Sequence, residues 1–206
     1  MSQYTKNTKN IIKMLLSFQI IIIFSSCLNK EKIIEFPDLR QMTTYSCGAS
    51  ALQSVLFYYG IDTKELELSK KLKTTPDWGT EHTEIEKIAI EYGLKVEMKE
   101  KMTIEDLKKF IDNKIPVILA IQAWQDRKIN YENDYDDGHY VVAIGYDDKK
   151  IIFEDPSTIG RGFLTYEELE KRWHDITKKN KKLEHFGMAI WGKPLKYHSK
   201  LIEHID

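Results

Sequence analysis

The sequence predicts an α+β domain, because helical patterns fill much of the first half of the chain and strand patterns fill the second half. Apolar residues recur at helical spacing between residues 47 and 112, whereas short apolar or alternating runs dominate from residue 115 to residue 192. Short polar turns join these runs, which is typical of antiparallel strands. The 206 residues suffice for one domain with a proper core.

The first half of the chain is expected to contain four helices and one strand. The first helix is predicted over residues 47–59, and Gly60 suits its C-terminal cap. A second helix follows Thr63, and residues 74–80 form a loop. The remaining elements are a helix opened by a Thr83–Glu86 capping box and closed by Gly93, a strand at residues 94–99 and a helix that starts at Thr103.

The second half is expected to supply most of the sheet. Residues 115–124 form a buried strand, followed by a long polar loop that is a candidate wall of a site. Residues 139–146 and 151–155 form two strands joined by the turn Asp147–Lys150. A short helix runs from Thr165 to about Trp173, and residues 185–192 form the last strand.

Charge is balanced along the chain, with 31 lysines and arginines against 32 acidic residues and a net charge of −1. The two signs are interspersed, so there is no basic stripe for nucleic acid and no acidic tail. The histidines show no fixed metal spacing. The sequence therefore implies no nucleic-acid partner, no metal and no organic cofactor.

The N-terminal segment resembles a bacterial lipoprotein signal. Lysines precede a short apolar run that ends in two serines directly before Cys27. This pattern predicts a signal peptide over residues 1–26, acylation of Cys27, a tether over residues 27–35 and a domain over residues 36–206. An uncleaved anchor and plain secretion are the alternatives. Each of them places the domain outside the cytoplasm, and acylation would anchor it to the cell envelope, in the periplasm or on the cell exterior.

Cys47 stands at the head of the first predicted helix, where the helix dipole and free N–H groups favour a thiolate. Exported proteins usually pair their thiols, and a lipidated Cys27 would leave Cys47 without a partner. A lone thiol of this kind is either buried or reactive. Three interpretations are therefore open: a nucleophile, an inert core residue, or half of a Cys27–Cys47 disulfide.

His139 and Asp155 lie on the two strands of the predicted hairpin. Their residue numbers sum to 294, so a hairpin centred on Asp147 sets them directly opposite each other on one face. An odd-length turn gives this pairing, and an even-length turn breaks it. Asp155 then orients the imidazole of His139, which forms an ion pair with Cys47. Alternatively, Asp155 is only a turn residue before Pro156.

Gln41 lies six residues before Cys47, where its amide can donate to an oxyanion together with the backbone N–H of Cys47. An ordinary loop amide is the alternative. Trp78 and Trp124 lie beside predicted loops, where they either line a cleft or pack in the core.

These residues also carry a family resemblance. The segments Gln41–Ala49, 138–147 and 154–156 resemble the bacteriocin-processing peptidases, which are papain-like domains that cut double-glycine leaders, and their stand-alone relatives. The resemblance covers roughly residues 36–192. It implies a papain-like fold, in which the nucleophile helix packs on a C-terminal, mainly antiparallel sheet. It also implies Cys47 as nucleophile, His139 as base, Asp155 as orienting acid and Gln41 as oxyanion donor.

The leading functional hypothesis is a cysteine peptidase or related thiol hydrolase that cuts a peptide or amide bond at the cell envelope through an acyl-thioester at Cys47. Its partners would be a peptide or protein substrate and, through the lipid on Cys27, a membrane. Ser46 stands where the leader peptidases often carry an acid, so the resemblance supports the chemistry more than double-glycine specificity. The alternatives are acyl or amide transfer by the same residues and a catalytically silent peptide-binding lipoprotein.

Overall fold

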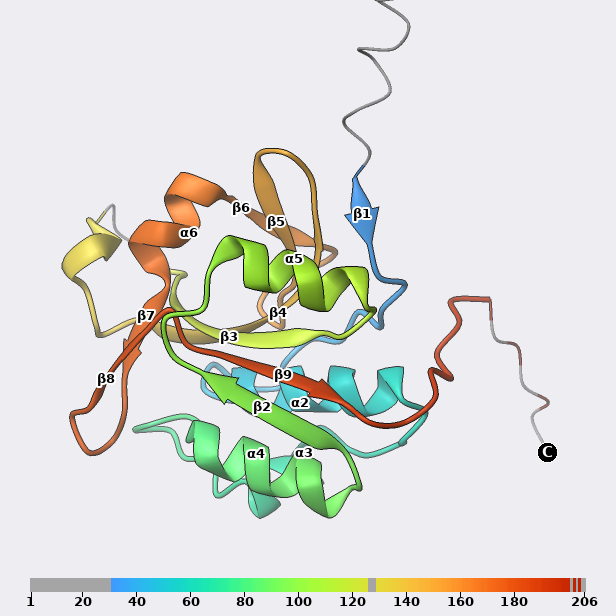
Figure 1. Cartoon of the computed structure of the whole chain (residues 1–206). Coiled ribbons are helices and arrows are strands. Elements are labelled where there is room, and N and C mark those ends of the chain that lie inside the picture. The colour runs from blue at the N-terminus through green and yellow to red at the C-terminus, as the bar shows by residue number, and fades with distance from the viewer. Residues whose placement is uncertain (1–30, 126–128, 201, 203, 205–206) are drawn as a thin grey trace, which may run out of the picture. The chain divides into compact units, whose positions relative to one another are not determined.

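Residues 31–125, 129–200, 202 and 204 are described by a computed structural model, which confirms the α+β prediction (Figure 1). Seven strands in this part of the chain form one antiparallel sheet in the order β2-β9-β3-β4-β5-β6, with β1 paired to β4 outside that path. The strands are β1 (Lys32–Ile33), β2 (Lys95–Lys99), β3 (Val117–Gln122), β4 (Gly138–Tyr146), β5 (Lys150–Glu154), β6 (Gly162–Thr165) and β9 (Gly187–Trp191). A separate two-stranded sheet pairs β7 (His174–Ile176) with β8 (Lys182–Glu184).

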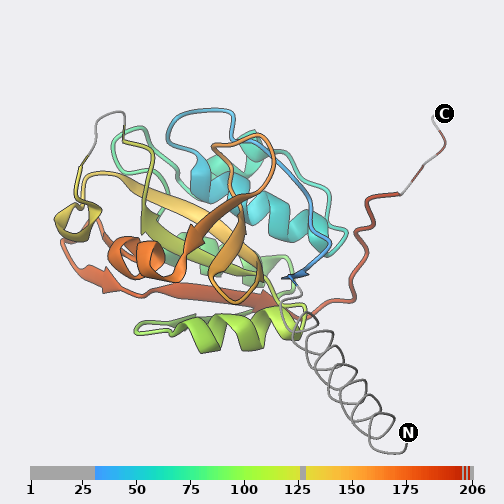
Figure 2. The ribbon, with the colours of Figure 1, turned by 90° about the horizontal axis from the view of Figure 1, so that it is seen from above.

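Helices cover both faces of the large sheet. Figure 2 shows α2 on one face and α5 on the other, with the strands between them. The helices of the described segments are α2 (Cys47–Tyr58), α3 (Glu65–Lys71), α4 (His82–Glu91), α5 (Ile104–Asp112) and α6 (Tyr166–Arg172), and a single 3-10 turn, η1 (Tyr131–Asn133), interrupts the loop before β4. This layering explains why every residue of β3 is buried: the strand is central, and both of its faces are covered.

Local sequence signals account for the starts of two helices, α5 and α6. The Thr103 side chain accepts from the backbone N–H of Asp106 and opens α5, and Thr165 opens α6 with the same capping box. The capping box predicted at Thr83 is wrong. The helix α4 starts one residue earlier, after Glu81, and no side chain caps it.

The hairpin of β4 and β5 tests the predicted pairing of His139 with Asp155. Four residues, 147–150, form its turn, because Tyr146 pairs with Ile151. This even-length turn gives facing residues an odd sum, which would place His139 and Asp155 on opposite faces of the sheet. The predicted direct opposition is therefore wrong.

A β-bulge restores a shared face. Ile144 is the extra residue of β4, since Gly145 pairs with Ile152 while Ala143 already pairs with Phe153. Beyond the bulge the register is shifted by one residue, and a shift of one residue moves side chains to the other face. The candidate histidine and aspartate therefore share a face as diagonal neighbours rather than as opposed residues.

The short strand β1 holds this bulge from the side. Its two residues pair with Tyr146 and Gly145. The backbone N–H of Ile34, directly after the strand, donates to the Ile144 carbonyl at 2.7 Å. A Cβ atom on Gly145 would lie 2.7 Å from the carbonyl oxygen of Lys32, so the close approach of β1 requires glycine there. Within the segment predicted as a tether, residues 32–33 thus form a strand of the sheet.

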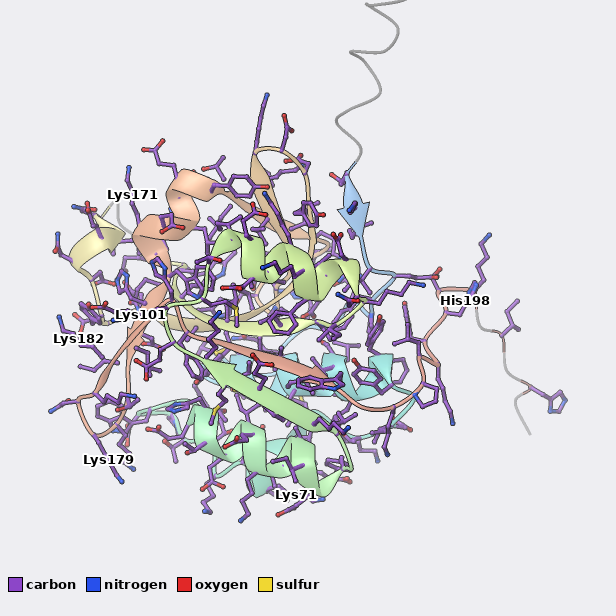
Figure 3. The ribbon with its side chains drawn as sticks, viewed as in Figure 1. Lys71, Lys101, Lys171, Lys179, Lys182 and His198 are labelled. Carbon is purple, nitrogen blue, oxygen red and sulfur yellow. The ribbon has the colours of Figure 1, made fainter. Side chains whose placement is uncertain are left out.

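Several lysine side chains extend from the periphery of the domain. Lys71, Lys171 and Lys179 point away from the body of the domain (Figure 3). Among the helices of the described ranges, none is both long and apolar enough to cross a membrane. Residues 1–30, which include the predicted signal peptide and Cys27, lie outside the described residues.

Candidate active site

The nucleophile candidate, Cys47, is the first residue of α2, as the sequence predicts. Within the described residues its thiol has no disulfide partner, and its side chain is nearly buried but borders a cleft. No side chain caps α2, because the Ser46 hydroxyl is hydrogen-bonded to Thr43, so the positive end of the helix faces the sulfur and stabilises a thiolate. A Cβ atom on Gly48 would lie 2.8 Å from the Cβ atom of Thr80, so the tight packing of α2 requires a glycine after the cysteine.

His139 is buried between the cysteine and the aspartate. Its Nε2 atom lies 2.7 Å from Oδ1 of Asp155. Because Nε2 is engaged by the carboxylate, Nδ1 is left for the thiol. Burial lowers the pKa of His139, but the interactions of the imidazole with Asp155 and Cys47 outweigh it and raise the pKa to about 10. This arrangement favours an imidazolium beside the sulfur at neutral pH.

Asp155 combines the two roles that the sequence left open. Its Oδ1 atom accepts from the backbone N–H of Ser157 at 2.8 Å, which is a turn interaction typical of aspartate before proline. The same oxygen engages His139, and Oδ2 accepts from the indole Nε1 of Trp124 at 3.1 Å. The turn therefore holds the carboxylate in place for the imidazole.

Gln41 lies on the same cleft, but its amide is engaged within the protein. Its Nε2 atom donates to the Thr43 carbonyl at 2.7 Å, and its Oε1 atom accepts from the Ser157 hydroxyl at 3.3 Å. The structure thus brings Gln41 to the site of Cys47 and His139. An oxyanion role requires the amide to turn away from the Thr43 carbonyl.

The cleft has a volume of about 680 Å³. Cys47 and His139 lie in its wall, and the polar loop before β4 forms part of it, as expected for a site wall. Trp78 and Trp124 both line it with about half of their surface exposed, so the cleft alternative for these two residues is confirmed over the packing alternative.

Two residues that the sequence did not single out complete the surroundings of His139. Gln122, fully buried, accepts from the backbone N–H of Asp137 and donates to Asp175, which ties the loop before β4 to β7. Burial raises the pKa of Asp175 to about 6. Neither residue lies in a recognisable motif, and only the fold brings them to the site.

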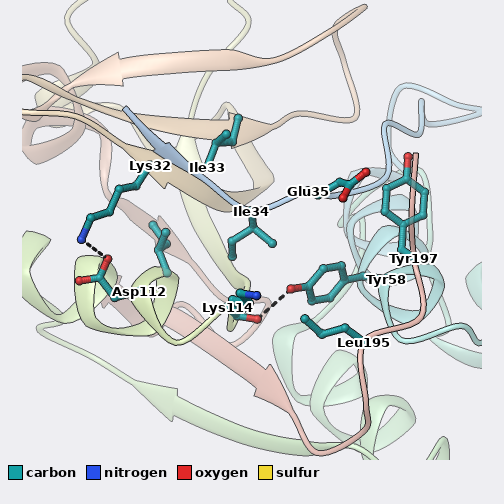
Figure 4. A pocket seen from close by; sticks show the side chains of 10 residues that line it. Lys32, Ile33, Ile34, Glu35, Tyr58, Asp112, Lys114, Leu195 and Tyr197 are labelled. Atoms are coloured by element: carbon teal, nitrogen blue, oxygen red, sulfur yellow. Dashed lines mark hydrogen bonds and ion pairs between the residues drawn. The ribbon is translucent and has the colours of Figure 1, made fainter. Parts of the chain in front are cut away.

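A second cavity, of about 650 Å³, lies at the other end of β4 (Figure 4). It is bordered by β1, α5 and the C-terminal segment, with an ion pair of Lys32 and Asp112 at 2.8 Å and a hydrogen bond from the Tyr58 hydroxyl to the Lys114 carbonyl at 3.0 Å. None of the site residues predicted within the described chain lies on it.

No group of three or more histidine, cysteine or carboxylate side chains in the described ranges is placed to hold a metal ion. Cys27 lies outside these ranges, so its acylation and its disulfide with Cys47 are not addressed by the fold.

A cysteine at a helix N-terminus with a histidine and an aspartate on the facing sheet is the arrangement of papain-like cysteine peptidases. Residues 33–181 match the Peptidase_C39 like family, and the chain belongs to that family. Its membership supports a cysteine-peptidase-like function. No curated protein sequence matches the chain.

Solved structures of this class share the fold. A double glycine motif protease from an AMS/PCAT transporter, solved in complex with its leader peptide, is 20% identical with a TM-score of 0.55, and the match covers 78% of this chain and 94% of that one. A C39-like peptidase from Bacillus anthracis is 19% identical with a TM-score of 0.62, covering 81% and 100%. The peptidase domain of Streptococcus ComA is 18% identical with a TM-score of 0.55, covering 79% and 99%. These likenesses confirm the predicted papain-like peptidase fold.

Proposed function

We propose that the chain is a thiol hydrolase, a cysteine peptidase that cleaves a peptide or amide bond through an acyl-thioester at Cys47. The observation that carries the proposal is His139, buried with one ring nitrogen on Asp155 and lying with Cys47 in the wall of the same cleft. An inert core thiol needs no such partner, whereas a nucleophile needs a base and a group that orients the base.

In the first half of the reaction, the Cys47 thiolate attacks the substrate carbonyl carbon, and the carbonyl oxygen becomes an oxyanion. The carbon–nitrogen bond then breaks, the leaving amine takes the proton held by His139, and the acyl group remains on sulfur. In the second half, His139 takes a proton from water, the hydroxide attacks the thioester, and the acid leaves as the thiol is restored. Asp155 holds the imidazole in position throughout.

Gln41 is proposed as a donor to the oxyanion together with the backbone N–H of Cys47. Its place on the cleft supports this role, and its bond to the Thr43 carbonyl holds it close to the reacting centre before substrate arrives. On substrate binding, the amide exchanges that carbonyl for the oxyanion.

The proposed place of action is the cell envelope. The signal-like residues 1–26, acylation of Cys27 and the tether to residue 35 support a lipid-anchored enzyme that faces away from the cytoplasm. The substrate would be a peptide or protein at that location. The solved relative with a bound leader peptide supports peptide binding in this fold.

The first experiment measures alkylation of Cys47 by iodoacetamide from pH 5 to pH 10, read at the level of the Cys47 peptide by mass spectrometry. The full chain, its His139→Ala variant and the urea-unfolded chain are compared. We expect rapid labelling of the folded wild type at pH 6, where the unfolded chain reacts slowly. The variant should lose this advantage and keep its circular dichroism spectrum.

A folded protein that labels no faster than the unfolded chain at pH 6 would overturn the proposal. The same result follows if His139→Ala labels like the wild type. A peptide library is then incubated with the wild type and with Cys47→Ala, and cleavage products are read by mass spectrometry. Hydrolysis predicts cleaved products only with the wild type, whereas acyl transfer predicts products joined to an added amine.

A further inference from the structure

Trp124 has an unusual place in the site. It follows β3, lines the cleft and leaves 57% of its surface exposed. Its indole Nε1 nevertheless donates to Oδ2 of Asp155 at 3.1 Å. An exposed tryptophan therefore reaches the carboxylate that engages His139, although Asp155 itself is only 5% exposed.

The indole completes the hydrogen bonding of this carboxylate. Oδ1 of Asp155 is shared by His139 and the backbone N–H of Ser157, whereas Trp124 is the hydrogen-bond partner of Oδ2 within the described residues. The two bonds to Oδ1 hold only one of the two carboxylate oxygens. The third bond, to Oδ2, holds the other oxygen and so fixes the plane of the carboxylate. A charge-assisted bond of this kind is among the stronger hydrogen bonds in proteins.

The backbone of Trp124 is strained. Its φ angle is +67°, in the left-handed region that bulky residues rarely adopt and that glycine adopts freely. Both neighbours are bonded to the loop that leads to His139: the Ala123 N–H donates to the Asp137 carbonyl, and the Gln125 N–H donates to the Tyr131 hydroxyl. A glycine would relieve the strain, so the presence of tryptophan points to a role for its side chain.

We propose that Trp124 is a positioning residue, whose indole N–H fixes the carboxylate of Asp155 and thereby the imidazole of His139 beside Cys47. The inference rests on the proposed function, since it assigns Trp124 to the same reaction. The large ring also covers the carboxylate on the side of the cleft, where water would otherwise compete for Oδ2.

The test uses the rate of Cys47 alkylation by iodoacetamide at pH 6 divided by the rate at pH 9, which needs no substrate. Trp124→Phe keeps an aromatic ring and removes the N–H. We expect the ratio to fall about tenfold, the size expected for losing a hydrogen bond to a charged group. Trp124→Leu should give the same loss, because neither side chain donates to Asp155.

Trp173→Phe is the matched control. Trp173 is fully buried, its indole donates to the Phe186 carbonyl at 2.9 Å, and it does not line the cleft. The same substitution therefore removes an indole N–H donor at a place where it does not bond to Asp155. It should lower the melting temperature and leave the alkylation ratio at the wild-type value.

Coupling to the aspartate is tested with Asp155→Ala. Trp124→Phe should have no further effect on the ratio in this background, because the group that it positions is gone. An equal effect in both backgrounds, or a wild-type ratio in both Trp124 variants, would overturn the inference. Failure of the proposed function is recognised separately, since the wild type would then show no enhanced labelling at pH 6.

Discussion

The two ends of β4 carry cavities of nearly equal volume and different chemistry. The end that begins with Gly138 borders a cleft with a thiol and with an imidazole that is bonded to a buried carboxylate. The end that finishes at Tyr146 borders a cavity that carries an exposed ion pair, that of Lys32 and Asp112. An exposed ion pair is paired within the protein and contributes little to binding or catalysis. A buried imidazole whose pKa is raised by its partners carries a proton that it can transfer.

The largest expected effect is on the rate of peptide cleavage, and it distinguishes the two ends of β4. Cys47→Ala should lower the rate of peptide cleavage by roughly 10³-fold or more, because the nucleophile is lost. Asp112→Asn at the other end should leave the rate unchanged. Initial rates on a peptide found in the library screen, with melting curves for both variants, make the measurement. Cleavage that survives Cys47→Ala would contradict the contrast between the ends.

The second prediction sharpens the role of the aspartate. Asp155→Ala should lower the rate by about 10²-fold, because His139 loses the partner that holds its orientation and supports its charge. Asp155→Asn should lose less, since its amide oxygen still accepts from the ring. The pKa of His139 should fall toward its ordinary value in the alanine variant, which histidine NMR resonances report across pH 5–10. Unchanged resonances would refute the interpretation of the ion pair.

The third prediction concerns Glu154, the residue directly before Asp155. Burial raises its pKa from 4.5 to about 8, against the hydrogen bonds from Leu39 and Ser54. The folded state therefore keeps a proton that the unfolded state releases above pH 4.5. The free energy of unfolding should fall between pH 4.5 and pH 8 by an amount on the order of 4 kcal/mol.

Glu154→Gln removes this pH dependence, because the amide keeps the shape of the neutral acid and does not ionise. Urea unfolding at pH 5, 7 and 9 should show an advantage of the variant that grows with pH. Parallel curves for the two proteins would show that Glu154 does not carry a raised pKa.

The smallest effect belongs to the other end of β4. Tyr58→Phe removes the hydrogen bond to the Lys114 carbonyl and should cost about 1 kcal/mol of unfolding free energy. The ratio of Cys47 alkylation at pH 6 to that at pH 9 should stay at the wild-type value. A changed ratio would mean that this end contributes to the chemistry of the cleft.

Sequence reasoning found the residues whose signals are local. Cys47 heads a helix with apolar residues at helical spacing, and His139 and Asp155 lie in a recognisable hairpin, so their elements were predictable from spacing alone. The register between the strands was not predictable, because Ile144 is an ordinary apolar residue in an apolar run. Only Gly145 hints at a bulge, and glycine in a strand has several other causes.

The remaining site features depend on contacts between distant segments. The bond from Trp124 to Asp155 joins residues 31 positions apart. The residues on either side of Trp124, Ala123 and Gln125, are hydrogen-bonded to the loop before β4. Gln122 and Asp175 meet across 53 positions. Side-chain pairing of this kind is decided by tertiary packing, which periodicity does not encode.

The bulge at Ile144 makes the hairpin a selector between two adjacent acids. Glu154 and Asp155 alternate in direction, so the register of the strands determines which of them meets the imidazole. If Ile144 were paired in the ladder instead of bulged out, Ala143 would face Glu154, and this longer acid would share the face of His139. Deletion of Ile144 would leave Ala143 opposite Phe153 and keep Asp155 on the face of His139, whereas pairing of Ile144 would change the catalytic partner.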